Sequence, residues 1–358
     1  MCVDMDTFVI ANSGTRREHV GRTYQGVHGY TPIAAYLGNE GWSVGLELRS
    51  GTHHSAPETE YFLDRVFPRI RRLMKGRHEP VLWRTDRGFH SARLLLALQA
   101  EGERWAAKQR SLDFVVKWNP RRQGRAGRVR RLVAEQAMKE TRVGKRVGYC
   151  SKTVARSIGG GPDKMRRALP LVVEVAEWTS DKKGQHLLAR EVELQGWWST
   201  LDAPPEESIK LYKSHGTHEQ FHSEIKTDLY LEPLPSGKFN THDAVLHLGE
   251  FAYNCLRLLG ELGFGGKITP VRHPSSRPRI TSVLQEIMRR AANVAKDANC
   301  LLLHFGHGVA AHAAVFIKLP ARLARACARE GPPGSAPKRR WRSRTSHTHA
   351  QGGAQRLQ

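Results

Sequence analysis

The sequence has few cysteines and contains no long apolar run. Its cysteines are scattered without a CxxC pair: Cys2, Cys150, Cys255, Cys300 and Cys327. This pattern argues against a zinc module or a disulfide framework and fits a reducing cytoplasm. No apolar stretch approaches the length of a membrane span, and the N-terminus lacks a signal-peptide pattern. The sequence therefore predicts a cytoplasmic protein with no membrane partner.

Acidic residues are also scarce. The chain of 358 residues has 34 Asp plus Glu against 57 Lys plus Arg, a formal net charge of +23. This excess predicts a polyanionic partner, and DNA, RNA and ribosomes fit it equally. The 18 histidines show no HExxH or similar spacing, which argues against that class of metal site. The length allows two or three domains with a substantial core.

The most informative stretch lies at residues 211–229. Wound as one α-helix at about 100° per residue, it gathers four polar residues within about 60°: Tyr212, His215, Glu219 and Lys226. The apolar residues fall on the opposite face: Leu211, Phe221, Ile225 and Leu229. A separate stripe of phenol, imidazole, carboxylate and ammonium groups favours a site for phosphate or metal. The alternative is an ordinary amphipathic surface helix.

Two aspartates are expected on strands upstream. Residues 1–10 predict a strand with Asp4 and Asp6 on the same side, and residues 79–90 predict a second strand that ends in Asp86. Open α/β sheets place ligands at the carboxyl ends of buried strands. A helix cap or a turn is the alternative for either position alone. With Glu219 these residues supply three carboxylates, the set that a pair of Mg²⁺ ions about 4 Å apart needs for phosphoryl transfer.

The helix residues resemble a known signature. Tyr212, His215, Glu219 and Lys226 have the spacing of the Tyr-x2-Arg-x3-Glu-x6-Lys motif in DDE transposases of bacterial insertion sequences. Histidine replaces the arginine, and an imidazole carries a less constant charge than a guanidinium.

The aspartates and two other stretches resemble the same branch. Asp6 resembles the first acid, with Asp4 the less favoured candidate, and Asp86 resembles the second. Residues 23–32 and 251–254 are also similar to this branch, and the resemblance covers about residues 3–320.

The resemblance implies a Mg²⁺-dependent transposase that cleaves DNA at insertion-sequence ends and joins the freed 3′-OH to target DNA. Asp6, Asp86 and Glu219 would hold two Mg²⁺ ions, for which Mn²⁺ could substitute. Tyr212, His215 and Lys226 would contact phosphate near the scissile bond. Such a protein would be associated with the nucleoid, and a homodimer is left open. The alternatives are a hydrolytic nuclease on the same core and an inactive or truncated remnant that only binds DNA.

The order of predicted elements agrees with the fold that the resemblance implies. Three meandering strands, a helix, a strand, a helix and a strand indicate an α/β, ribonuclease-H-like mixed sheet with flanking helices, interrupted by a β-rich insertion before the last catalytic helix. The expected parts are a first core segment (1–118), a basic β-rich insertion (119–203), a second core segment (204–265), a C-terminal helical segment (266–330) and a disordered tail (331–358).

The insertion opens with a basic segment. Residues 119–148 hold ten Lys or Arg against two Glu, which favours contact with a DNA backbone over a solvated hairpin. The arginines singled out for this contact are Arg121, Arg122, Arg130 and Arg131. Trp197 and Trp198 offer two interpretations: stacking on an extruded base or burial in a strand, which is favoured for at least one of them.

The first acid lies at residue 6, which leaves no room for the separate DNA-binding domain that such transposases usually carry before the core. A truncated copy, a start placed downstream of the real one, and recognition of the ends by another segment are the alternatives.

Overall fold

The structure is a computed structural model that describes residues 1–55, 58–119, 138–158, 165–181, 183–214, 218–264, 277–289, 292–297, 300–305 and 319–325. The arginines proposed for DNA contact, His215 and the tail at 331–358 lie outside these residues. Within the described ranges, no helix has both the length and the apolar character needed to cross a membrane.

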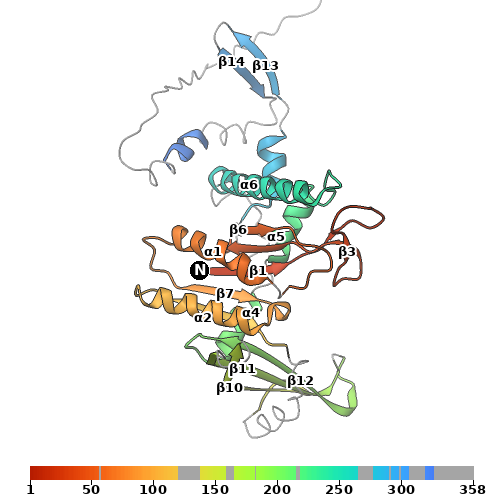
Figure 1. Ribbon diagram of the computed structural model, residues 1–358, viewed down its shortest axis with the longest axis vertical. Helices are drawn as coiled ribbons and strands as arrows, with labels where there is room; N and C mark the ends of the chain where they lie inside the picture. Colours follow the sequence, from red (N-terminus) through yellow and green to blue (C-terminus); the bar gives the residue numbers. More distant parts are fainter. Residues whose placement is uncertain are drawn as a thin grey trace, which may run out of the picture.

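A nine-stranded mixed sheet forms the centre of the molecule (Figure 1), with the strand order β6-β5-β1-β7-β8-β12-β11-β10-β9. The strands are β1 (Cys2–Thr7), β5 (Ile33–Leu37), β6 (Trp42–Glu47), β7 (Val81–Thr85), β8 (Leu112–Lys117), β9 (Lys139–Arg142), β10 (Lys145–Ile158), β11 (Met165–Ser180) and β12 (His186–Ser199). The strands β1, β5 and β6 form an antiparallel meander, whereas β1, β7 and β8 run parallel. This is the arrangement of a ribonuclease-H-like core, so the predicted fold class is confirmed.

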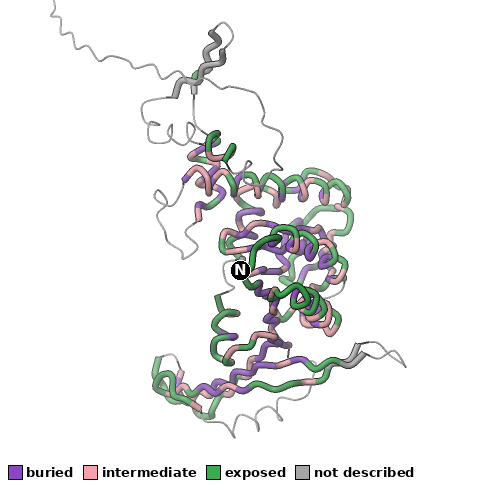
Figure 2. The backbone as a smooth tube through the Cα atoms, turned by 90° about the vertical axis from the view of Figure 1, so that its left-hand side faces the viewer, coloured by how far each residue is buried: buried purple, intermediate pink, exposed green. Residues whose placement is uncertain are grey.

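The central strands are buried because helices cover both of their faces. All five residues of β5 and all five of β7 are buried, as expected for strands enclosed on both sides. Figure 2 shows this buried interior between helices whose outer sides are exposed. The functional side chains must therefore lie where the strands end.

Different helices cover the two faces of the sheet. The helices α1 (Thr59–Leu73) and α2 (Ala92–Ala106) pack on one face, where Val3, Met5 and Trp83 join their core. The opposite face is covered by α4 (Pro205–Lys213), α5 (His218–Ser223) and α6 (Phe239–Phe264). Because side chains alternate along a strand, Asp4 and Asp6 point to this second face.

The insertion continues the core sheet. Its strand β12 pairs antiparallel with β8, so that Trp198 lies opposite Val116, and β11, β10 and β9 follow outward. Trp197 is 1% exposed and Trp198 is 0% exposed. Burial in the strand is therefore the correct interpretation for both tryptophans, because neither ring surface is open to a base.

The strands β2 (Ile10–Ala11), β4 (His28–Tyr30) and β3 (Gly21–Arg22) form a small separate sheet. One segment differs from the element expected for it. The C-terminal segment is only partly helical. There α7 (Ile280–Val283) and a π-helix (Leu284–Met288) are followed by the strands β13 (Ala292–Asp297) and β14 (Cys300–Phe305).

Candidate active site

Asp6 and Asp86 lie at the carboxyl ends of neighbouring parallel strands. The register of β1 and β7 pairs Asp4 with Arg84 and Met5 with Thr85. Asp6 and Asp86 are the residues that come next along these two strands, so they lie side by side. The same logic extends to β8, where Val116 pairs with Thr85 and Lys117 follows. Two carboxylates and an ammonium thus occupy three adjacent strand ends, as the sequence predicted for the two aspartates.

Asp86 also shapes its own loop. Its side chain accepts a hydrogen bond from the backbone N–H of Gly88 at 2.9 Å and caps the 3₁₀ turn Arg87–Phe89. Asp6 accepts a bond from the backbone N–H of Thr7 at 2.7 Å. Each carboxylate therefore accepts a hydrogen bond from a backbone N–H of its own loop.

Asp4 has a different role. Arg84 donates from Nε to Asp4 Oδ1 at 2.6 Å and from NH2 to Oδ2 at 2.8 Å. The same guanidinium donates from NH1 to the Leu211 carbonyl and the Ser214 hydroxyl at the end of α4. Asp4 is thus committed to a buried bidentate pair that fixes α4 on the sheet, and Asp6 is the better candidate for the first acid.

Two tyrosine hydroxyls face the aspartates. Burial of the Tyr212 hydroxyl, and secondarily the charges of Asp86 and Asp6, raise the pKa of Tyr212. Tyr24 is 64% exposed as a residue, but its hydroxyl donates to the Thr7 carbonyl at 3.3 Å. Desolvation there, followed by the charges of Asp6 and Asp86, raises the pKa of Tyr24 to about 12. Both phenols are neutral hydrogen-bond donors near neutral pH.

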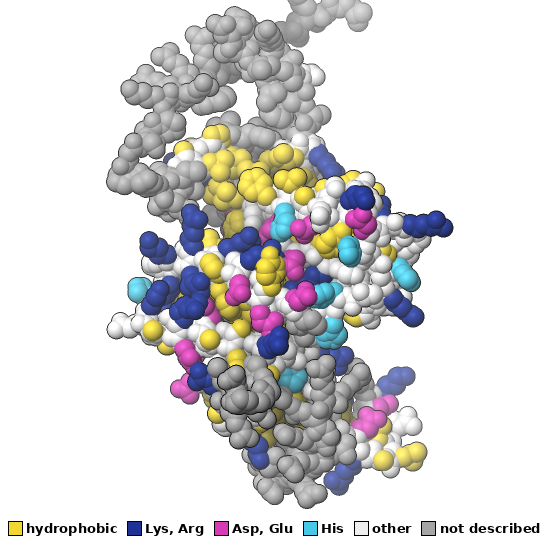
Figure 3. Space-filling view, viewed as in Figure 1, with side chains coloured by type: hydrophobic (Ala, Val, Ile, Leu, Met, Phe, Trp, Pro, Cys, Tyr) yellow, Lys and Arg dark blue, Asp and Glu magenta, His cyan; other side chains and the backbone are white. Residues whose placement is uncertain are grey.

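The neighbouring cation is also perturbed. Partial burial, and then the adjacent positive charge of Arg87, lower the pKa of Lys117, while the charge of Asp86 opposes this effect. Figure 3 shows one face of the molecule, with acidic side chains in its middle and lysine and arginine side chains around them. At the strand ends, Asp6, Asp86 and Lys117 together suit a ligand that carries negative charge and binds through a cation.

His222 connects the aspartates to α5. Its Nε2 atom lies 3.9 Å from Asp6 Oδ2, and its ring stacks on Phe8 with centroids 4.6 Å apart. The Nδ1 atom shares a hydrogen bond with the Tyr36 hydroxyl at 3.1 Å. Glu219 lies one turn earlier on α5 and is exposed. The helix that carries Glu219 is therefore seated beside Asp6.

The prediction of a single helix over residues 211–229 was wrong. Helix α4 ends at Lys213, α5 begins at His218, and a π-helix follows over Glu224–Asp228. Tyr212 and Glu219 thus lie on different helices, and Leu211, expected on the buried face, is 41% exposed. Phe221 and Ile225 are buried as predicted.

The other residues of the signature lie in different surroundings. Lys226 lies in the π-helix and pairs with Glu232, with Nζ 3.1 Å from Oε1. His215 belongs to the undescribed segment between α4 and α5. Tyr212 remains close to the aspartates, with its ring beside Trp197 at 5.8 Å between centroids. The structure thus unites Tyr212 with Asp6 and Asp86, and places Lys226 in a separate ion pair.

The donors fit a hard divalent cation in chemical type. Asp6 and Asp86 offer carboxylate oxygens side by side, which Mg²⁺ prefers. Across the described ranges, however, no group of three or more His, Cys, Asp or Glu side chains is close enough to hold a metal ion. The aspartates are therefore in place, whereas Glu219 is on the covering helix and outside such a group.

A family model for transposase DDE domain group 1 matches residues 1–328. The chain belongs to this family. The predicted resemblance to DDE transposases is thus confirmed at the level of the family, while membership in the insertion-sequence branch stays a prediction. No curated protein matches this DDE transposase sequence.

One solved structure similar to this DDE transposase chain is that of a piggyBac transposase in a synaptic complex with hairpin DNA. The sequence identity is 9%, and the TM-score is 0.37. The match covers 72% of this chain and 46% of that one, so this chain spans about half the length of the piggyBac protein.

Four residues near the candidate site were missed by the sequence interpretation: Tyr24, Arg84, Lys117 and His222. Strand alternation would have placed Arg84, two residues before Asp86, on the same side of its strand, whereas Lys117 lies beside Asp86 only through the pairing of β7 with β8. The spacing of three between Glu219 and His222 is a helical neighbour relation. Only the fold, however, brings Tyr24 and Asp6 together.

Proposed function

We propose that this chain is a metal-dependent transposase that cleaves DNA at insertion-sequence ends and transfers the freed strand to target DNA. The observation that carries the proposal is the position of Asp6 and Asp86 at adjacent carboxyl ends of β1 and β7, on the face that the Glu219 helix covers. Family membership supports the same class of chemistry.

In this proposal Asp6, Asp86 and Glu219 hold two Mg²⁺ ions, and Mn²⁺ can substitute. When bound, such ions activate the attacking oxygen and stabilise the leaving one. Tyr212 donates a hydrogen bond toward the phosphate, because its raised pKa keeps the phenol protonated. His215 and Lys226 are assigned to the same phosphate, and Lys226 must exchange its partner Glu232 for it.

DNA is the proposed partner. The formal net charge of +23 supports long-range attraction to a polyanion, and Arg121, Arg122, Arg130 and Arg131 are assigned to the DNA backbone. The protein would then be cytoplasmic and associated with the nucleoid, and a homodimer stays a prediction. Insertion-sequence ends and target DNA are its two proposed substrates.

The test is a nicking and strand-transfer assay on labelled DNA that carries matched ends, with Mg²⁺ or Mn²⁺. We expect Glu219→Gln, Asp6→Asn and Asp86→Asn to lower nicking by orders of magnitude while DNA binding survives. Glu207→Gln, an exposed change on α4, is the matched control and should leave nicking unchanged.

The products separate the candidate activities. Joined products identify a transposase, whereas nicking without joining identifies a hydrolytic nuclease on the same core. DNA binding without any metal-dependent nicking would contradict the proposed catalysis and leave a DNA-binding remnant.

A further inference from the structure

The helix that carries Glu219 changes its winding one turn after that residue. Glu224–Asp228 form a π-helix, in which the backbone N–H of Leu229 donates to the Glu224 carbonyl at 3.0 Å. Single π-turns inside helices are often found at functional sites. Glu224, at the start of this turn, is 1% exposed, so its carboxylate points into the protein interior.

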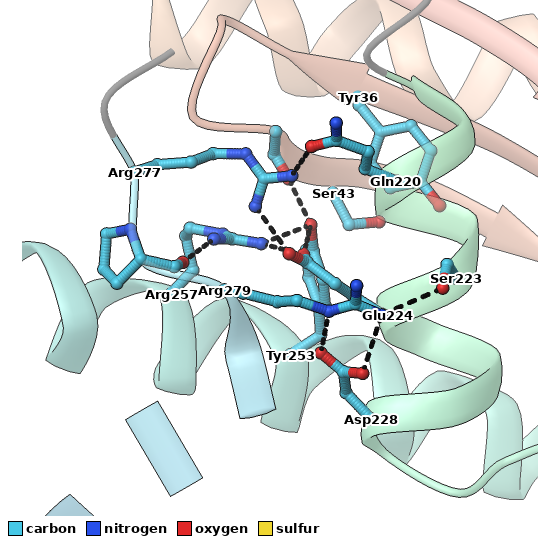
Figure 4. Close-up of polar contacts among 12 residues, drawn as sticks. Tyr36, Ser43, Gln220, Ser223, Glu224, Asp228, Tyr253, Arg257, Arg277 and Arg279 are labelled. Carbon is cyan, nitrogen blue, oxygen red and sulfur yellow. Dashed lines mark hydrogen bonds and ion pairs between the residues drawn. The ribbon is translucent and has the colours of Figure 1, made fainter. Parts of the chain in front are cut away.

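Two buried guanidinium groups meet the Glu224 carboxylate (Figure 4). Arg277 donates from NH1 to Oε1 at 2.7 Å, and Arg257 donates from NH2 to Oε2. The Tyr253 hydroxyl oxygen lies 3.4 Å from Oε2. The side chains of Arg257 and Arg277 are 0% and 4% exposed. We refer to Glu224, Tyr253, Arg257 and Arg277 as the Glu224 cluster.

Stability alone does not account for the Glu224 cluster. Buried ion pairs often add no more stability than apolar side chains of the same volume, because desolvation offsets their attraction. Their geometry is restrictive, however, since a carboxylate and two planar guanidinium groups fit together in few orientations. Such a cluster therefore fixes the position of the helix that carries Glu224.

Arg277 reaches beyond Glu224 to the turn that holds Glu219. Its NH2 group donates to Gln220 Oε1 at 3.4 Å, and its guanidinium lies over the Phe221 ring at 4.4 Å from the centroid. Gln220 is the residue next to Glu219. Arg277 thus contacts α5 itself as well as Glu224, the residue directly after it.

On the side that faces the sheet, α5 packs closely against Gly41. A Cβ atom on Gly41 would lie 2.3 Å from the Phe221 ring, and the Tyr253 hydroxyl donates to the Gly41 carbonyl at 2.9 Å. His222 contacts Asp6 on the sheet side. With α5 fixed by Phe221 and His222 on the sheet side, contacts from 277–279 determine its remaining rotation.

A second arginine holds the far end of the π-helix. Arg279 donates to both oxygens of Asp228 at 2.9 and 3.0 Å and to the Ser223 hydroxyl at 3.0 Å. Arg257 in turn donates to the Pro278 carbonyl at 2.8 Å. The segment 277–279 is therefore anchored to α6 and to α5 at the same time.

We propose that Arg277 is a positioning residue for Glu219, acting through the Glu224 cluster to set the rotation of α5 against Asp6. This role rests on the proposed function, in which Glu219 is a metal ligand. Loss of Arg277 would leave α5 folded but would let Glu219 turn away from the strand ends, so metal would bind less tightly while DNA binding remained.

The experiment compares Arg277→Met with Arg71→Met in the full chain. Arg71 is a matched control because it also pairs with a buried carboxylate, that of Glu101 at 2.7 Å, which Arg104 shares. This pair lies between α1 and α2, away from α5. Both variants remove one of two arginines from a buried glutamate, so both should lower thermal stability.

Only Arg277→Met should change the metal dependence. We expect the Mg²⁺ concentration for half-maximal nicking to rise about tenfold or more, which is the size of effect seen for residues behind a metal ligand. Affinity for DNA should stay as in the native chain. Arg277→Lys keeps the charge beside Glu224 and should recover part of the metal affinity, and it also serves if Arg277→Met does not fold.

Hydrogen exchange of residues 218–228 gives a readout that does not depend on activity. Exchange there should speed up in Arg277→Met and stay native-like in Arg71→Met. An unchanged metal dependence, or an equal change in both variants, would overturn the positioning role. A native chain that neither nicks nor binds Mn²⁺ would refute the proposed function instead, and the exchange data would then judge the positioning of α5 alone.

Discussion

Arg84 binds Asp4 through two hydrogen bonds and holds the end of α4 with the same guanidinium. The side chains of Asp4 and Arg84 are 4% and 3% exposed, so the pair is part of the interior. Asp6, two residues along the same strand, lies instead at the open strand end beside Asp86. The two aspartates of β1 therefore have separate tasks, which structure-based variants can distinguish.

Asp4→Asn should mainly lower stability, whereas Asp6→Asn should mainly lower nicking. Asp4→Asn breaks a buried pair and should lower the free energy of unfolding by about 3 kcal/mol or more, with nicking per folded molecule retained. Asp6→Asn should change stability by less than about 0.5 kcal/mol and abolish nicking. Urea unfolding and nicking assays on both variants check this. Loss of nicking from Asp4→Asn at native stability would reverse the assignment of the first acid.

His215→Arg restores the residue that the transposase signature carries. A guanidinium stays charged at all accessible pH values, whereas an imidazole loses its charge above about pH 6.5. Strand transfer should therefore be held or raised at neutral pH, most visibly above that value. His218→Arg, which adds the same charge three residues along, should have no such effect. If the native chain and His215→Arg are both inert on matched ends with Mg²⁺ and Mn²⁺, the catalytic proposal is lost.

The basic segment should dominate the salt dependence of DNA binding. Replacing Arg121, Arg122, Arg130 and Arg131 with alanine should reduce the slope of log K against log salt by up to about 3.6, since each phosphate contact contributes about 0.9. The control replaces four exposed basic residues of the α1–α2 region: Arg72, Lys75, Arg77 and Lys108. Equal slopes for both variants would place the DNA interface elsewhere.

Tyr212 should act as a hydrogen-bond donor and not as a base. Burial raises its pKa, and that of Tyr24 is raised to about 12, so neither phenol ionises between about pH 7 and 10. Tyr212→Phe should lower nicking about tenfold, the worth of one bond to a charged group, by the same factor at each pH. Tyr61→Phe, at an exposed site on α1, is the control. A pH-dependent loss in Tyr212→Phe would contradict this role.

His242 should make the protein less stable in acid. It is fully buried and shares a hydrogen bond with the Tyr30 hydroxyl at 3.2 Å, and burial lowers its pKa. The unfolded chain therefore takes up the proton at a higher pH than the folded chain. The contribution of neutral His242 to the free energy of unfolding is fully present above about pH 6.5 and is lost as the pH falls toward the folded-state pKa.

Replacing His242 should remove part of this pH dependence. Urea unfolding at several pH values should show a flatter curve for His242→Asn than for His28→Asn, a change at an exposed histidine. Equal pH dependence in both variants would show that His242 does not carry the effect.

The sequence by itself determined the core of the fold and the order of its acids. The segments at 33–37, 81–85 and 112–117 form mostly buried strands, and their many apolar side chains are typical of strands enclosed on both faces. Asp6 and Asp86 were predictable as acids near the carboxyl ends of such strands. Local periodicity was enough for these residues because their environment depends on their own strand.

Tertiary structure decided where the Glu219 helix begins, how it winds and what it faces. Periodicity over 211–229 predicted one helix, but Arg84 holds the end of α4, and Arg277 and Arg257 bind the Glu224 carboxylate in the π-turn. These partners come from positions far away in the chain, so no pattern within the helix itself could reveal them. The contact of His222 with Asp6 likewise exists only because folding brings α5 onto the carboxyl end of β1.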